Sequence, residues 1–111
     1  MRNSIISKDS LVLVALENEH VVVYSISGIT KRPPIFQSNT LGFIYDMAVN
    51  SSYRRKSIGK RMLDQILTWF NSRNVDRVEV SVVTGNTIAN SFWRKHGFQD
   101  YEHILYLKNS S

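Results

Sequence analysis

The sequence predicts an α/β protein in which helices flank a mixed β-sheet. Short apolar runs rich in valine and isoleucine recur between residues 11 and 49, which is typical of strands. The hydrophobic period changes to nearly four over residues 57–73 and returns to two over residues 78–82. A helix that links two strands in this way makes a parallel crossover, so we expect both parallel and antiparallel pairs in one sheet.

The first strands are expected to form a β-hairpin. Two β-rich runs, residues 11–16 and 21–28, are separated by the polar residues 17–20. Pro33 and Pro34 should end the second strand after Lys31, because proline has no N–H for the ladder, and a loop should follow to about Asn39. Residues 42–49 then resume as a mostly apolar strand of the kind found within a covered sheet.

The second half of the chain should alternate helices and strands. Residues 57–73 form an amphipathic helix with two adjacent apolar rows, made of Ile58, Met62, Ile66, Trp69, Leu63, Leu67 and Phe70. A second helix is expected over residues 86–95, closed by Gly97 in left-handed geometry. Residues 101–108 are expected to form the last strand.

Composition limits the possible classes of protein. The 111 residues, with 42% hydrophobic and 21% charged, predict one globular domain over residues 1–111. The absence of cysteine excludes disulfides, thiolate metal sites and a cysteine nucleophile, and it agrees with the cytoplasmic location that we expect. The longest apolar runs are too short to span a bilayer, so no membrane partner is expected. The three histidines, His20, His96 and His103, have no metal-ligand spacing, and we expect no metal.

The net charge of +5 favours an anionic partner, which could be a nucleic acid, an acidic membrane surface or a phosphorylated cofactor. Nucleic-acid binding would require a basic stripe wider than one loop. The positive charge is instead concentrated between the strand that ends at Val49 and the helix that follows. The sequence therefore favours a phosphorylated cofactor over a nucleic acid.

The loop before the first helix has the features of an anion site. Helix N–H groups without acceptors and the helix dipole attract phosphate, and Gly59 lets a ligand approach the backbone. Four basic side chains add full charges, those of Arg54, Arg55, Lys56 and Lys60. The alternative is a solvated basic face on an ordinary helix start.

Two motifs resemble those of the GNAT superfamily of N-acetyltransferases, and the resemblance covers residues 11–108. The loop is similar to [QR]-x-x-G-x-[GA], with Arg54 first, Ser57 in place of the first glycine, and Gly59 last. Serine can cap a helix through its hydroxyl, but we expect it not to tolerate left-handed geometry as glycine does. The family's second element, N-x-x-A-x(3)-[YF]-x(3)-G-F, matches the following residues: Asn86, Ala89, Trp93, Gly97 and Phe98.

The resemblance implies transfer of an acetyl group from acetyl-CoA to a primary amine of an acceptor that the sequence does not identify. It assigns the strand before the loop to the pantetheine arm, the loop to the pyrophosphate, and Asn86 to the cofactor arm, although Asn86 could equally be a helix N-cap. The cofactor-binding residues that we expect are Met47, Ala48, Val49, Arg54, Arg55, Lys56, Ser57, Ile58, Gly59, Lys60, Asn86 and Trp93.

The catalytic groups are less apparent. Ser81 stands where many family members carry a glutamate, and nearby Glu79 is interpreted as a solvated carboxylate. Trp93 replaces the usual proton-donating tyrosine, and an indole does not release its proton near neutral pH, so Trp93 would pack against the thioester or in the core. Tyr45 is the best substitute hydroxyl, with an aromatic core role as its alternative. Asp46 is expected on the other face of the strand.

The family usually begins with a strand and two helices that border the acceptor site, whereas ten residues precede the first predicted strand here. The chain is therefore expected to be an N-terminally shortened member. Three explanations of an open acceptor side are considered. The enzyme accepts a large substrate, a second subunit of a homodimer completes the wall, or the chain is a fragment of a longer polypeptide. We expect the homodimer. The alternative function is a CoA-binding or regulatory module that has lost its chemistry.

Overall fold

The structure is a computed structural model that describes residues 2–31, 40–54 and 57–109. The chain divides into two compact units, Met1–Ser81 and Val82–Ser111. The elements are, in order, β1 (Arg2–Ile6), β2 (Ser10–Glu17), β3 (His20–Lys31), β4 (Thr40–Val49), the 3-10 helix η1 (Ser51–Tyr53), α1 (Ile58–Ser72), β5 (Arg77–Val80) and α2 (Thr87–Lys95).

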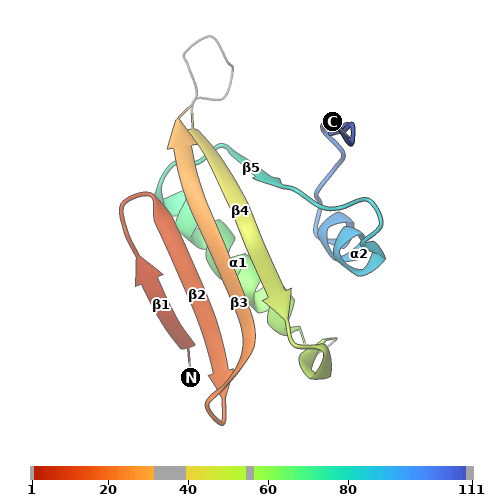
Figure 1. The fold of residues 1–111 in the computed structure, drawn as a ribbon. Helices are drawn as coiled ribbons and strands as arrows, with labels where there is room; N and C mark the ends of the chain where they lie inside the picture. The colour runs from red at the N-terminus through yellow and green to blue at the C-terminus, as the bar shows by residue number, and fades with distance from the viewer. Residues whose placement is uncertain (1, 32–39, 55–56, 110–111) are drawn as a thin grey trace. The chain divides into compact units, whose positions relative to one another are not determined.

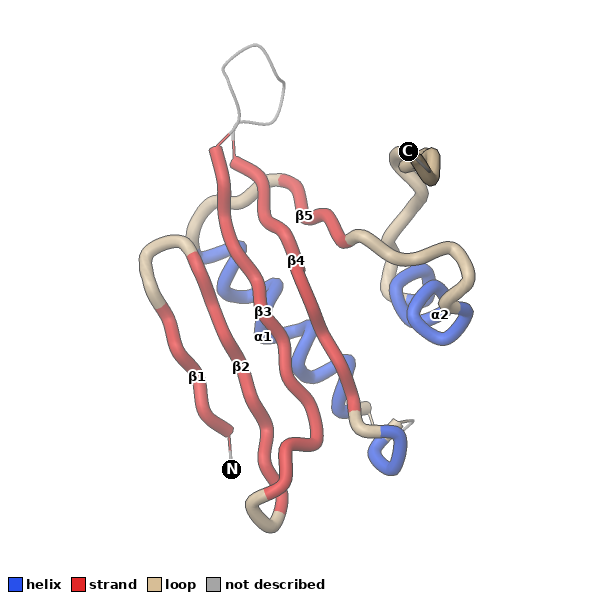
Figure 2. Tube along the Cα trace, viewed as in Figure 1, coloured by secondary structure: helices blue, strands red, loops and turns tan. Residues whose placement is uncertain are grey.

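The first unit contains a mixed five-stranded sheet in the order β1-β2-β3-β4-β5. Neighbouring strands from β1 to β4 are antiparallel, whereas β5 is parallel to β4. Helix α1 connects β4 to β5 and lies across one face of the sheet (Figures 1 and 2). The predicted mixed sheet and its parallel crossover are therefore confirmed.

The predicted hairpin is formed by β2 and β3. Its two turn residues, Asn18 and Glu19, both have positive φ, at 51° and 66°, which matches the right-handed twist of the flanking strands. An additional strand, β1, pairs with β2 and was not predicted, because its residues show no clear polar and apolar alternation. The loop predicted after Lys31 lies outside the described residues.

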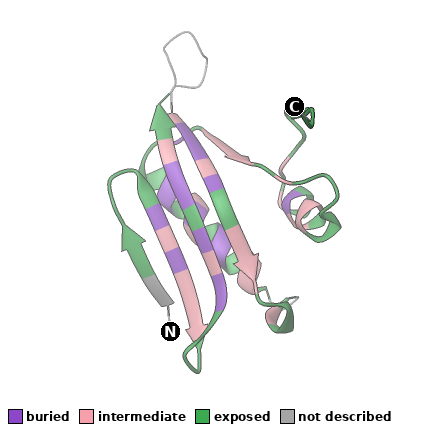
Figure 3. Cartoon of the chain, viewed as in Figure 1, coloured by how far each residue is buried: buried purple, intermediate pink, exposed green. Residues whose placement is uncertain are grey.

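The core of this unit lies between α1 and the sheet, and burial alternates along the strands that face the helix (Figure 3). Five of the seven predicted helix positions are buried, namely Met62, Leu63, Ile66, Trp69 and Phe70. Gly42 makes room for this packing, since a Cβ atom there would lie 2.7 Å from the Phe70 ring. Asn74, with φ 59°, follows the helix in left-handed geometry.

The second unit contains α2, which begins and ends as predicted. The Asn86 side chain caps its first turn by accepting from the Ala89 N–H, and Gly97 has φ 95°. The prediction of a last strand over residues 101–108 is wrong, because this described segment forms no strand pairing. A strand needs a neighbouring strand with free N–H and C=O groups, and apolar alternation alone does not supply one. In this segment Ile104 and Leu107 remain 79% and 89% exposed.

Candidate functional site

The first part of the connection from β4 to α1, residues 50–54, is anchored by hydrogen bonds. Asn50 donates its backbone N–H to the Val22 carbonyl at 2.8 Å, and its side chain accepts from the Ser52 N–H at 3.0 Å. Tyr53 N–H then donates to the Asn50 carbonyl at 2.8 Å. These bonds fix the end of β4 against β3.

Ser57 lies immediately before α1 in left-handed geometry, with φ 60° and ψ 14°. The expectation that serine would not adopt this conformation is therefore wrong. Its side chain makes no capping hydrogen bond, so the predicted hydroxyl cap is also absent. Left-handed geometry costs a residue with a Cβ about 1–2 kcal/mol, and here the local fold imposes the conformation that a glycine in the motif would adopt freely.

The first turn of α1 follows with Ile58, Gly59 and Lys60 and contains no acidic residue. The first N–H groups of an α-helix have no acceptor within the helix and carry partial positive charge. Lys60 is partly neutralised by Asp64 at 3.0 Å, with both side chains 57% exposed. Arg54 adds a further charge just before the loop, and two predicted residues, Arg55 and Lys56, lie outside the described residues.

The edge of β4 that leads into this loop is paired on one side. Met47, Ala48 and Val49 pair with β3. On the other side β5 pairs with β4 only from Leu41 to Ile44, so β5 provides no partner for Met47–Val49. The outer backbone groups of this stretch are therefore not used by β5.

A β-bulge in β4 determines where its polar side chains point. Ser27 pairs with Ile44 and Ile26 pairs with Asp46, so Tyr45 is the extra residue. Because of this shift, Tyr45 and Asp46 both lie on the face opposite α1. The expectation that Asp46 points to the other face from Tyr45 is therefore wrong, because regular alternation fails at the bulge.

On this face the side chains form a defined cluster. The Tyr24 hydroxyl donates to Asp46 Oδ2 at 2.8 Å, and this hydrogen bond is the main cause that raises the pKa of Tyr24. The Tyr45 ring is stacked on Phe43 with centroids 5.8 Å apart and is 63% exposed. A Cβ atom on Gly28 would lie 2.6 Å from the Tyr45 ring, so the glycine provides space for it.

Glu79 on β5 is ion-paired with Arg77, whose Nε lies 2.8 Å from Glu79 Oε2. Its side chain is only 17% exposed, so the interpretation of Glu79 as a solvated carboxylate is wrong. The sequence pattern did not indicate this ion-pair partner.

Asn86 and Trp93 belong to the second unit. Trp93 is 7% exposed and makes edge-on contacts with Phe92 and Phe98, at centroid distances of 5.0 and 5.1 Å. These contacts support the interpretation that Trp93 packs in a core. Tyr45, the β4 edge and the described part of the α1 loop all lie in the first unit.

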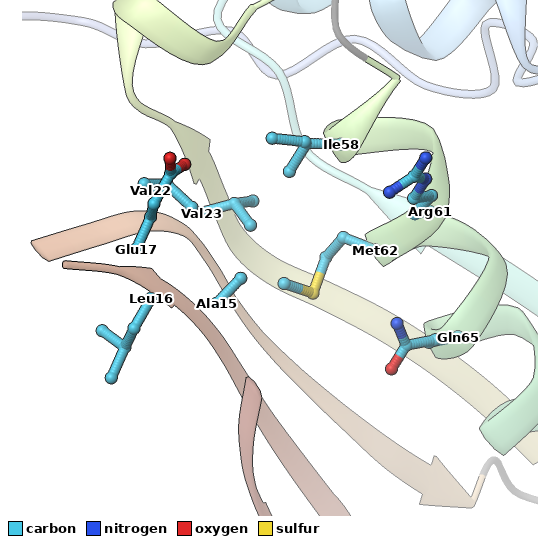
Figure 4. A pocket seen from close by; sticks show the side chains of 9 residues that line it. All are labelled: Ala15, Leu16, Glu17, Val22, Val23, Ile58, Arg61, Met62 and Gln65. Carbon is cyan, nitrogen blue, oxygen red and sulfur yellow. The ribbon is translucent and has the colours of Figure 1, made fainter. Parts of the chain in front are cut away.

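A separate hollow of about 590 Å³ lies on the α1 side of the sheet (Figure 4). It lies between α1 and the ends of β2 and β3, with Met62 and Ala15 among its apolar residues and Arg61, Gln65 and Glu17 among its polar ones. The Glu17 carboxylate also accepts a hydrogen bond from the Tyr53 side chain, which raises the pKa of Tyr53. Of the predicted site residues that the structure describes, only Ile58 borders this hollow.

The described residues hold no group of three or more histidine, cysteine, aspartate or glutamate side chains that could bind a metal. None of the helices in the part of the chain that the structure describes has the length and apolar character needed to cross a bilayer.

The sequence model of the acetyltransferase (GNAT) family matches residues 2–98. No curated protein matches the sequence. A mutant of the BH1408 protein from Bacillus halodurans has 24% identity and a TM-score of 0.83, and the match covers 93% of this chain and 68% of that one.

Aminoglycoside acetyltransferases share the fold at lower identity. The apo aminoglycoside 6'-N-acetyltransferase AAC(6')-IG from Acinetobacter haemolyticus has 19% identity and a TM-score of 0.77, with 95% of this chain and 73% of that chain covered. AAC(6')-Iy in complex with CoA has 14% identity and a TM-score of 0.80, with coverage of 95% and 79%. This chain spans only part of the length of each of these matched chains. The family match over most of the chain shows that this protein belongs to the GNAT acetyltransferase family.

Proposed function

We propose that this protein transfers an acetyl group from acetyl-CoA to a primary amine. The observation that carries the proposal is the β4 to α1 connection of a family member: a strand edge that β5 leaves unpaired is followed by a sequence of basic residues, with Ser57 in left-handed geometry at a helix N-terminus. Such an edge can pair with the amides of a pantetheine arm, and such a loop suits a pyrophosphate.

Within this proposal each expected residue has one role. Met47, Ala48 and Val49 pair with the pantetheine arm. The pyrophosphate is bound by Arg54, Arg55, Lys56, Ser57, Ile58, Gly59 and Lys60. Asn86 uses its Oδ1 for the α2 cap, so its amide nitrogen is the group offered to the cofactor. Trp93 contributes apolar packing beside the cofactor.

Tyr45 is the proposed proton donor. The neutral amine attacks the thioester carbonyl, the C–N bond forms, and the C–S bond breaks to release the CoA thiolate. The phenol of Tyr45 protonates that thiolate and regains a proton that the acetylated nitrogen releases to solvent. An exposed phenol with a reference pKa of about 10 can perform this step, whereas an indole cannot.

The test is release of free thiol from acetyl-CoA across a panel of primary amines that includes aminoglycosides, with the acetylated product identified by mass spectrometry. Thiol release that requires the amine supports the proposal. The Tyr45→Phe variant should slow transfer by about 10²-fold or more without changing acetyl-CoA affinity. If the Phe variant transfers at the full rate, Tyr45 is not the donor.

The second candidate function is a CoA-binding module without catalysis. It is favoured by the packing of Trp93 between two aromatic rings and by the pairing of Glu79 with Arg77, which leave these positions without an evident acid or base. Acetyl-CoA binding without thiol release from any amine in the panel would favour this module over the enzyme. The cytoplasmic location and the homodimer expected from the sequence stay predictions.

A further inference from the structure

The cluster opposite α1 combines an exposed aromatic ring with an exposed carboxylate. The bulge at Tyr45 places both groups on one face, beside each other in the chain. Phe43 supports the Tyr45 ring by stacking at an interplanar angle of 18°. Gly28 leaves the space into which that ring fits.

The Asp46 carboxylate is held in position and remains available. Tyr24 donates to Oδ2, which fixes the orientation of the group. Tyr24 is the one side-chain partner that the described residues provide for Asp46, so Oδ1 is open to a ligand. The Tyr24 phenol is the donor and the Asp46 carboxylate is the acceptor of this bond, which raises the pKa of Tyr24.

The negative charge on this face comes from one described residue of the central strands. Among the described residues of β2, β3 and β4, Asp46 alone brings a carboxylate to it, since Glu17 of β2 borders the hollow on the α1 side. On β5, Glu79 is already paired with Arg77. A carboxylate beside an exposed aromatic face is a recognition site for a cation, because both the charge and the ring quadrupole attract it.

The attacking amine has to lose its proton before it reacts, whereas a group bound to Asp46 is favoured in its protonated form. The two are therefore different groups on one acceptor. We propose that the acceptor carries a second cationic group, bound by Asp46 and the ring of Tyr45, so that the substrate class is diamines and larger polyamines. This inference rests on the proposed function for the transfer step.

The experiment compares putrescine, a diamine, with butylamine, the monoamine of the same chain length. Transfer kinetics are measured for the wild type, for Asp46→Asn and for the matched control Asp9→Asn, which changes an aspartate in the turn after β1. The wild type should use putrescine with a kcat/KM about 10- to 100-fold above that for butylamine. Asp46→Asn should bring the two substrates to nearly equal values, and Asp9→Asn should retain the preference.

Tyr24→Phe separates positioning of Asp46 from its charge. This variant removes the bond to Oδ2 and keeps the carboxylate, so it should raise KM for putrescine several-fold while kcat changes little. Circular dichroism and acetyl-CoA titration confirm that each variant is folded and binds cofactor. If Asp46→Asn retains the diamine preference, or if the wild type has none, the inference is wrong and the proposed transferase function stands.

Direct titration of putrescine decides the inference if no transfer occurs at all. Calorimetry is then performed on the protein alone and with CoA present. Binding that weakens about 10-fold or more in Asp46→Asn supports the cation site even though the transferase proposal has failed. Equal binding of putrescine by both proteins, or no binding to the wild type, overturns the inference of a cation site.

Discussion

The two faces of the sheet are built in different ways. Under α1 the packing is close: Ile66 and Phe70 are 0% and 1% exposed, and Gly42 lies against an aromatic ring. On the opposite face Tyr45 is 63% exposed, and Asp46 is exposed beside it. One face thus stabilises the fold and the other presents chemical groups. The same type of substitution should therefore affect stability on one face and transfer on the other.

Two glycines offer a matched pair, since each leaves room for an aromatic ring on its own face. In Gly28→Ala the new Cβ would lie 2.6 Å from Tyr45, and this exposed ring can swing away. We expect transfer to fall about 10- to 100-fold, because misplacing a reacting group by about 1 Å has an effect of that order. Steady-state kinetics would show this, and an unfolding midpoint close to that of the wild type is the accompanying expectation.

Gly42→Ala makes the same change under α1. Its Cβ would lie 2.7 Å from the ring of Phe70, a residue that is only 1% exposed. Overpacking of this kind costs about 1–3 kcal/mol in the free energy of unfolding. Denaturant titration measures the loss. A Gly42→Ala protein as stable as Gly28→Ala would show that the two faces do not differ in packing.

Much of the fold was predictable from residue patterns, and the errors have identifiable causes. The helix over residues 57–73 and the hairpin follow from local periodicity, which is retained in the fold. The strand expected over residues 101–108 failed because a strand depends on a partner, and pattern alone does not supply one. β1 was missed because an edge strand can form from residues without alternation.

The candidate site was predictable to a similar extent. The position of the Gly59 segment at the start of a helix follows from the residue pattern, although the backbone at Ser57 contradicted the usual preference of serine. The face on which Asp46 lies was predicted wrongly, because a bulge reverses the face of every following residue and the sequence does not mark the bulge. The pairing of Ile26 with Asp46 and of Ser27 with Ile44 reveals it.

A smaller effect is expected at the buried serines of β3. Ser25 donates to the Met62 sulfur at 3.3 Å, whereas the Ser27 hydroxyl is fully buried and has no partner among the described residues. An unsatisfied buried hydroxyl is unfavourable, so Ser27→Ala should leave stability unchanged or raise it by up to about 1 kcal/mol. Ser25→Ala serves as the control and should destabilise. Denaturant titration that reversed this order would contradict the hydrogen-bond assignment.

The smallest effect concerns alkaline pH. The pKa values of Tyr24 and Tyr53 are raised by hydrogen bonds to Asp46 and Glu17. A raised folded-state pKa contributes stability that is complete below the unfolded value of about 10 and is lost as pH rises through the folded value. Tyr24→Phe should therefore reduce the decline in stability above about pH 10. Unfolding midpoints at pH 8 and at about pH 11, compared with the wild type, would measure it, and an identical decline would contradict the assigned bond.

The central claim is that the loop before α1 binds the phosphates of acetyl-CoA, and titration calorimetry with Gly59→Val tests it most directly. The added side chain blocks close approach to the first turn of α1, while Asn71→Val adds the same side chain near the other end of that helix. The account predicts that the wild type and Asn71→Val bind acetyl-CoA with similar affinity and that Gly59→Val loses at least about 100-fold. A folded Gly59→Val protein that binds acetyl-CoA as tightly as the wild type would contradict the assignment.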